Sequence, residues 1–181
     1  CHRVQPAQVT RKFDSLLLGQ VHQRRVNPHF ALHSEAQCTL ERCQRAGRTL
    51  AAPELVEADS AEIADDAWVL GVVIEGEARA YSLNLLNRHE VVNDHIGGSP
   101  IAITYCPLCG TGVAFDAGGA AAARSFGVSG LLYNSDVLLY DRKTESLWSQ
   151  ILSKAVSGKM AGQKLKILPV RHTSWQTWRK E

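Results

Sequence analysis

The chain of 181 residues is long enough for one domain with a hydrophobic core and too short for two large ones. With 45% hydrophobic and 21% charged residues, its composition excludes a disordered chain and is typical of a globular protein. The net charge of +2 argues against a nucleic-acid partner, and no apolar stretch approaches the roughly 20 residues that a membrane-spanning helix needs.

The first third of the chain differs from the rest, because residues 1–53 are rich in His, Gln and Arg. We expect a partly ordered N-terminal extension over 1–53, and a β-rich domain over 54–181 that is truncated at its C-terminal end. The chain begins with Cys1, the residue that cleavage of a lipoprotein signal leaves at the mature N-terminus, so Cys1 is a candidate lipid anchor. Five cysteines are an odd number, which excludes a simple disulfide framework.

From Trp68 onward, β-branched and apolar runs alternate with Gly-containing turns, a pattern that predicts consecutive hairpins. The predicted strands cover residues 69–74, 78–81, 90–96, 100–105, 112–116, 124–129 and 131–141. Ser82 is expected to cap a short helix that ends near His89. The segment Thr173-Ser174-Trp175-Gln176-Thr177-Trp178 is expected to cap and open a last helix. The predicted fold class is α+β: a β-dominated single domain of antiparallel hairpins with a few short helices.

The segment Tyr105-Cys106-Pro107-Leu108-Cys109-Gly110 carries the strongest chemical signal, and we expect it to form a turn between two strands. A Cys-x-x-Cys pair suits reversible disulfide chemistry or half of a tetrahedral metal site. Because strand-like residues follow Cys109, a thioredoxin-like pair at a helix N-terminus is disfavoured. The pattern Cys-Pro-x-Cys-Gly also matches a zinc knuckle, which needs two more ligands.

Two histidines and several polar residues complete the candidate site. His89 is expected near the sulfurs, because its helix leads into the strand that pairs with the strand carrying Cys106, and His95 lies on that same pairing strand. Trp148 could form an aromatic wall beside polar donors. The substrate-binding candidates are Asn93, Asp94, Trp148, Ser149 and Gln150.

Seven motifs give the sequence a family resemblance. They are Val69-Leu70-Gly71-Val72, Gly76-Glu77-Ala78-Arg79-Ala80-Tyr81, His89-Glu90-Val91-Val92-Asn93-Asp94, Thr104-Tyr105-Cys106-Pro107-Leu108-Cys109-Gly110-Thr111, Phe126-Gly127-Val128-Ser129-Gly130, Tyr133-Asn134-Ser135-Asp136 and Leu147-Trp148-Ser149-Gln150. These stretches closely resemble the bacterial and archaeal family called domain of unknown function 3179, from about residue 55 to Trp178.

The resemblance implies a (seleno)protein. Some members of that family carry selenocysteine at the position matching Cys106, and some relatives carry threonine where Cys109 stands. Selenium serves where a low pKa and reversible oxidation are needed, so the resemblance implies that Cys106 is the attacking thiol and Cys109 a resolving one. It also implies export from the cytoplasm.

Two hypotheses of different classes follow. In the first, the chain is an extracytoplasmic thiol oxidoreductase or peroxidase that needs no cofactor. Cys106 attacks a small-molecule oxidant or a protein disulfide, Cys109 resolves the product, and His89 or His95 lowers the pKa of Cys106. In the alternative, the chain is a binding module whose zinc or copper ion is held by Cys106, Cys109, His89 and His95.

Overall fold

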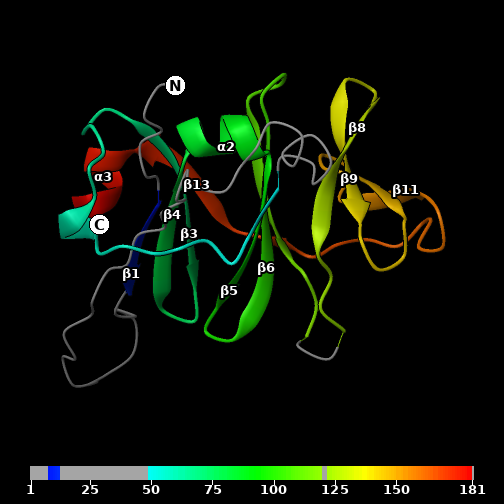
Figure 1. The fold of residues 1–181 in the computed structure, drawn as a ribbon, viewed down its shortest axis with the longest axis horizontal. Coiled ribbons are helices and arrows are strands. Elements are labelled where there is room, and N and C mark those ends of the chain that lie inside the picture. Colours follow the sequence, from blue (N-terminus) through cyan, green and yellow to red (C-terminus); the bar gives the residue numbers. More distant parts are fainter. Residues whose placement is uncertain (1–7, 13–48, 120–121, 181) are drawn as a thin grey trace.

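The computed structural model describes residues 8–12, 49–119 and 122–180, which form three β-sheets and three short helices. The first sheet has the strand order β1-β4-β3-β13, the central sheet β12-β7-β6-β5-β2, and the third β11-β10-β9-β8. In Figure 1 the central strands β5 and β6 stand between the β3–β4 hairpin and the strands β8, β9 and β11.

The elements have the following bounds. The strands are β1 (Gln8–Lys12), β2 (Thr49–Ala51), β3 (Trp68–Ile74), β4 (Glu77–Ser82), β5 (Val91–Ile96), β6 (Ser99–Cys106), β7 (Thr111–Asp116), β8 (Phe126–Tyr133), β9 (Asp136–Asp141), β10 (Leu147–Ser149), β11 (Lys154–Ser157), β12 (Ile167–Leu168) and β13 (Val170–Ser174). The helices are η2 (Ala58–Ser60), α2 (Leu83–His89) and α3 (Trp175–Lys180).

The predicted α+β, β-dominated fold class is confirmed. Strands β3 and β4 form an antiparallel hairpin, and so do β5 and β6, whose turn residues Gly97 and Gly98 both have positive φ, at 59° and 84°. Ser82 caps α2 by accepting a hydrogen bond from the backbone N–H of Asn84, as expected. Apart from the parallel pair β2–β5, the strand pairs named above are antiparallel.

The segment 131–141, expected as one strand, is part of a hairpin instead. Asn134 and Ser135 have φ values of 51° and 64°, and two consecutive residues with positive φ make the tight turn that suits a two-residue hairpin. The chain therefore reverses between β8 and β9, and Tyr133 lies opposite Asp136 in the register. This reversal sets Asp136 at the first position of β9.

Side-chain alternation along β6 divides the core into two clusters on opposite faces of the central sheet. Ile101, Ile103 and Tyr105 belong to the cluster that β3, β4 and α2 share, whereas Ala102 and Cys106 belong to the cluster with Phe126, Leu139 and Trp148 from the third sheet. The period of two thus directs the Cys106 side chain toward the third sheet.

The predicted boundary between extension and domain falls among strands that pair across it. In the described part of the extension, β1 pairs with β4, and β2 pairs with β5. The rest of residues 1–53, including Cys1, Cys38 and Cys43, lies outside the described residues. None of the helices in the described ranges is long and apolar enough to cross a membrane.

Candidate functional site

The two cysteines lie on the turn between β6 and β7, as the sequence predicted. Cys106 ends β6 and pairs with Thr111, the first residue of β7. The carbonyl oxygen of Cys106 accepts a hydrogen bond from the N–H of Gly110 at 2.8 Å and one from the Cys109 thiol at 3.9 Å. Gly110 has a φ of 66°, a conformation that favours glycine, and it closes the turn around the sulfurs.

The two thiols are both free but differ in exposure. Cys106 is 1% exposed and belongs to the core, whereas Cys109 is exposed. Only Cys109 is therefore open to a bulky reactant from solvent.

The pKa values of the two thiols are shifted in opposite directions. Burial raises the pKa of Cys106, and the hydrogen bond that its thiol donates to Cys109 raises it further, against the lowering effect of the backbone N–H groups of Cys109 and Leu108. For Cys109, burial and the negative charge of Asp136 act to raise the pKa, but hydrogen bonds from the Cys106 thiol and from Thr111 outweigh them and lower it. The arrangement favours a thiolate on Cys109 beside a protonated Cys106.

Asp136 joins the pair from the third sheet. One ligand atom each from Cys106, Cys109 and Asp136 lie within 4.8 Å of one another. The Asp136 carboxylate is buried, and its Oδ2 accepts hydrogen bonds from Ser149 Oγ at 2.8 Å and from the N–H of Ile151 at 3.0 Å. Its Oδ1 is buried without a hydrogen-bond partner in the described residues.

Ser149 and Gln150, expected to bind substrate, contact the site indirectly, Ser149 through Asp136 and Gln150 through β6 and β7. Ser149 fixes the Asp136 carboxylate. Gln150 is fully buried, and its Nε2 donates to Thr104 Oγ1 at 2.9 Å and to the Thr111 carbonyl at 3.2 Å. Thr104 is two residues before Cys106, on the same face of β6, so Gln150 holds the third sheet against the strand that carries the thiol.

The histidines do not join this group. In the strand register His95 lies opposite Pro100, at the far end of the β5–β6 hairpin and roughly 20 Å of strand from Cys106. His95 therefore cannot share a ligand shell with the sulfurs. His89 ends α2 at the same end of the hairpin as Cys106, but its ring nitrogens are not among the clustered ligand atoms of the described residues.

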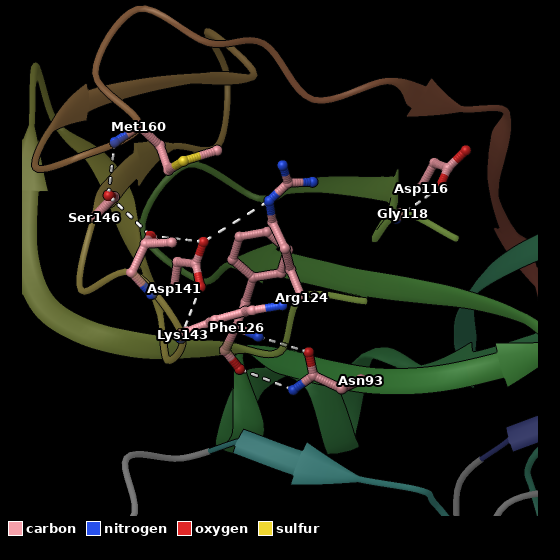
Figure 2. A network of polar contacts seen from close by, with 10 residues as sticks. Asn93, Asp116, Gly118, Arg124, Phe126, Asp141, Lys143, Ser146 and Met160 are labelled. Carbon is pink, nitrogen blue, oxygen red and sulfur yellow. Dashed lines mark hydrogen bonds and ion pairs between the residues drawn. The ribbon is translucent and has the colours of Figure 1, made fainter. Parts of the chain in front are cut away.

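Asn93 and Asp94, expected at the substrate, hold the sheets together. The Asn93 side chain donates to the Phe126 carbonyl and accepts from the Phe126 N–H, both at 2.8 Å, and so links β5 to β8 (Figure 2). Asp94 is buried and accepts from Arg79 Nη1 at 2.7 Å and from the Tyr81 hydroxyl at 2.8 Å. Asp94 lies opposite Ile101, which is five residues from Cys106 along β6. Its carboxylate links β4 to β5 through the hydrogen bonds from Arg79 and Tyr81.

Trp148 is a core residue. It is fully buried, packs edge to face on Phe126 at 6.1 Å between ring centroids, and lies under the Arg124 guanidinium. Figure 2 shows the neighbouring polar network, in which the same Arg124 faces Asp141. The predicted aromatic wall of a substrate pocket is thus interior packing, and the adjacent Ser149 reaches the site.

Asp136 is the residue that the sequence analysis missed. Its signal was present in the motif Tyr133-Asn134-Ser135-Asp136, because an Asn-Ser pair between two apolar runs can form a hairpin turn and so start a new strand at the acidic residue.

Comparison with known proteins places the chain in a family. The model of a family described as protein of unknown function (DUF3179) matches residues 49–181, a range that contains every residue of the site. No curated protein and no solved structure matches the chain.

Proposed function

We propose that this chain, which belongs to the DUF3179 family of proteins of unknown function, is a thiol–disulfide exchange protein that uses Cys106 and Cys109. One observation carries the proposal: two free thiols share one turn, the exposed one has a lowered pKa, and its buried neighbour donates a hydrogen bond to it. Such an asymmetric pair is the arrangement in which one thiolate attacks and the other thiol resolves.

The exposures support an order of attack opposite to the one expected from the family resemblance. That resemblance made Cys106 the attacking thiol, but Cys106 is buried under the turn and burial raises its pKa. Cys109 is exposed, and its pKa is lowered. We therefore assign the first attack to Cys109 and the resolving step to Cys106.

Disulfide exchange at this pair of thiols takes two steps. The Cys109 thiolate attacks a partner disulfide, forms a mixed disulfide with one partner sulfur and releases the other as a thiolate. Cys106 then loses its proton and attacks the Cys109 sulfur, which forms the Cys106–Cys109 disulfide and releases the second partner thiol. The protein dithiol loses two electrons and the partner disulfide gains them, and the reduction potentials of the two partners decide the net direction.

The surface around the thiols supports a polypeptide partner over a small oxidant. Six exposed apolar side chains lie on the three segments that meet at Cys109 and Asp136, and we call them the apolar rim: Leu108, Leu131, Leu132, Tyr133, Ile151 and Leu152. Figure 1 shows the β6–β7 turn and the tip of the β8–β9 hairpin at the same end of the molecule. Exposed apolar patches mark interaction surfaces, and a peroxide would need none. We infer that the substrate is a disulfide within an apolar polypeptide segment.

A closed structural zinc site has less support. The described residues offer three clustered ligand groups rather than four, and Cys109 is open to solvent. The extracytoplasmic location implied by the family resemblance agrees with the proposal, since disulfide-bonded polypeptides persist outside the cytoplasm.

The test is trapping of the mixed disulfide. A peptide disulfide flanked by leucines is incubated with Cys106→Ser and with Cys109→Ser, and adducts are identified by intact-protein mass spectrometry. We expect a stable adduct on Cys109 in Cys106→Ser, because no resolving thiol remains, and none in Cys109→Ser. A stable adduct in Cys109→Ser alone would restore the order that the family resemblance implied, and the absence of adducts in both would overturn the redox function.

A further inference from the structure

The buried carboxylate of Asp136 has one unsatisfied oxygen. Asp136 is 3% exposed, and while Oδ2 accepts two hydrogen bonds, Oδ1 has no partner in the described part of the chain. A buried polar atom without a partner destabilises the fold, and more so when it is charged, so Oδ1 is a site at which a ligand would be favoured. The donors to Oδ2 hold the carboxylate in place, which leaves Oδ1 as the atom available to a ligand.

This carboxylate belongs to a cluster of side chains that could bind a metal ion. The sulfurs of Cys106 and Cys109 and an oxygen of Asp136 lie within 4.8 Å of one another. Around a tetrahedral zinc ion, two thiolate sulfurs bound at about 2.3 Å are separated by about 3.8 Å. The three groups therefore need only a small inward movement to close on one ion.

We propose that the reduced dithiol binds one Zn²⁺ through Cys106 Sγ, Cys109 Sγ and Asp136 Oδ1, and that formation of the Cys106–Cys109 disulfide expels the ion. The regulatory part of this proposal rests on the proposed redox function. The site differs from the one expected from the sequence, because Asp136 takes the place of His89 and His95.

The chemistry of the donors selects zinc. Two thiolates and one carboxylate suit a borderline ion such as Zn²⁺, whereas copper(I) favours purely soft ligands and Mg²⁺ oxygen ligands. Three protein ligands leave the fourth position open to water on the exposed side of Cys109.

Binding and release balance in protons and electrons. Zn²⁺ displaces the thiol protons of Cys106 and Cys109 and forms two zinc–sulfur bonds. When a partner disulfide oxidises the two thiolates, both zinc–sulfur bonds break and one sulfur–sulfur bond forms. The partner takes up two electrons from the thiolates and two protons from the solvent, and Zn²⁺ leaves. The bound ion thus keeps the dithiol reduced until an oxidising disulfide arrives.

The experiment measures zinc affinity in the reduced full chain. Protein stripped with a chelator and kept reduced is titrated with Zn²⁺ against a chromophoric chelator, for wild type, Asp136→Asn and Asp116→Asn. The asparagine at 136 keeps an oxygen that can accept from Ser149 and Ile151. Asp116 is a matched control, because its carboxylate pairs with Lys166 at the surface.

We expect one zinc ion per chain in wild type and in Asp116→Asn. Asp136→Asn should bind at least about tenfold more weakly, since losing a direct ligand costs no less than losing an outer-shell partner. If Asp136→Asn does not fold, the number of thiolate ligands is read from the charge-transfer absorption of Co²⁺-loaded wild type and Cys109→Ser. Two thiolates on cobalt in wild type and one in Cys109→Ser support the site.

Two outcomes overturn the zinc site: no stoichiometric binding by folded, reduced wild type, or equal affinity in wild type and Asp136→Asn. If the protein exchanges disulfides but does not bind zinc, the zinc site is overturned and the proposed redox function still stands. If zinc binding depends on Asp136 but the dithiol never exchanges with a disulfide, the zinc site is supported and the proposed redox function is overturned.

Discussion

The two thiols differ in acidity although only Pro107 and Leu108 separate them. This difference in acidity arises from the surroundings of the two side chains. Cys106 is buried in the core, while Cys109 is exposed on the turn and accepts hydrogen bonds from Cys106 and Thr111. Each thiol needs the other for its role, since the buried thiol lowers the pKa of the exposed one by donating to it.

This difference predicts the pH dependence of labelling. In metal-free, reduced protein, a short pulse of iodoacetamide should modify Cys109 at a lower pH than Cys106, because a lowered pKa keeps a thiol in the reactive thiolate form further into the acid range. Peptide mapping by mass spectrometry at each pH gives the two profiles.

A matched variant isolates the cause of the difference. Cys106→Ala removes the hydrogen-bond donor, so the labelling profile of Cys109 should move to higher pH. In urea, where the turn is lost, the two wild-type thiols should label together. Coincident profiles in the folded wild type would contradict the asymmetry.

At the scale of elements, β4 and β5 are joined by a buried ionic cluster. Arg79 donates to Asp94 at 2.7 Å and to Glu77, and Tyr81 donates to the same Asp94 oxygen that Arg79 reaches. Burial raises the pKa of Tyr81 well above its ordinary value, so the phenol remains a donor at neutral pH. The cluster connects the first sheet to the central one.

Removal of the carboxylate tests this structural role. Asp94→Ala leaves Arg79 buried beside one fewer acid, and we expect it to lower the free energy of unfolding by about 3 to 5 kcal/mol. Urea denaturation measures the loss. Asp116→Ala serves as control: it breaks an exposed ion pair with Lys166 and one hydrogen bond from the N–H of Gly118, and we expect a change of about 1 kcal/mol. Where Asp94→Ala is still folded, iodoacetamide labelling of Cys109 should match wild type. A folded Asp94→Ala variant in which the labelling of Cys109 differs from wild type would show that Asp94 acts on the site.

At the scale of the whole molecule, the site lies where the central and third sheets meet at one end. Cys106 and Cys109 come from the β6–β7 hairpin of the central sheet and Asp136 and Ser149 from the third sheet. The residues of the apolar rim lie on the same chain segments. The rim residues lie on segments 105–112, 128–138 and 147–153. Apart from the buried Asp136, these three segments contain no charged residue. A neutral, apolar partner segment suits such a surface.

A charge placed on the rim tests the partner class. Leu132→Lys should slow exchange with a leucine-flanked peptide disulfide by on the order of tenfold, since losing about 1.4 kcal/mol of apolar contact corresponds to that factor. Exchange with a small uncharged disulfide such as 2-hydroxyethyl disulfide should stay unchanged. Ile167→Lys, at an equally exposed position outside the rim, is the control and should behave as wild type with both substrates. Equal slowing with both disulfides would show that the rim does not select polypeptides.

The local features of this protein were determined by the sequence alone. Strand alternation, the glycine turn at Gly97-Gly98 and the cap at Ser82 are governed by neighbouring residues, so the hairpins and the turn carrying Cys106 and Cys109 could be predicted. The hairpin turn at Asn134-Ser135 was missed because its residues also occur within strands, although both have positive φ in the fold.

Only the tertiary structure decided which side chains meet. Asp136 and Gln150 are separated from Cys106 by 30 and 44 positions in the chain. Asp136 reaches the sulfurs and Gln150 reaches Thr104 because the third sheet packs on the face of β6 that carries Thr104 and Cys106. His95 is close to the cysteines in the sequence but far along the strand, because the register of a hairpin separates residues near its turn from residues at its open end. Proximity in the chain predicted the hairpin, and packing between sheets selected the site.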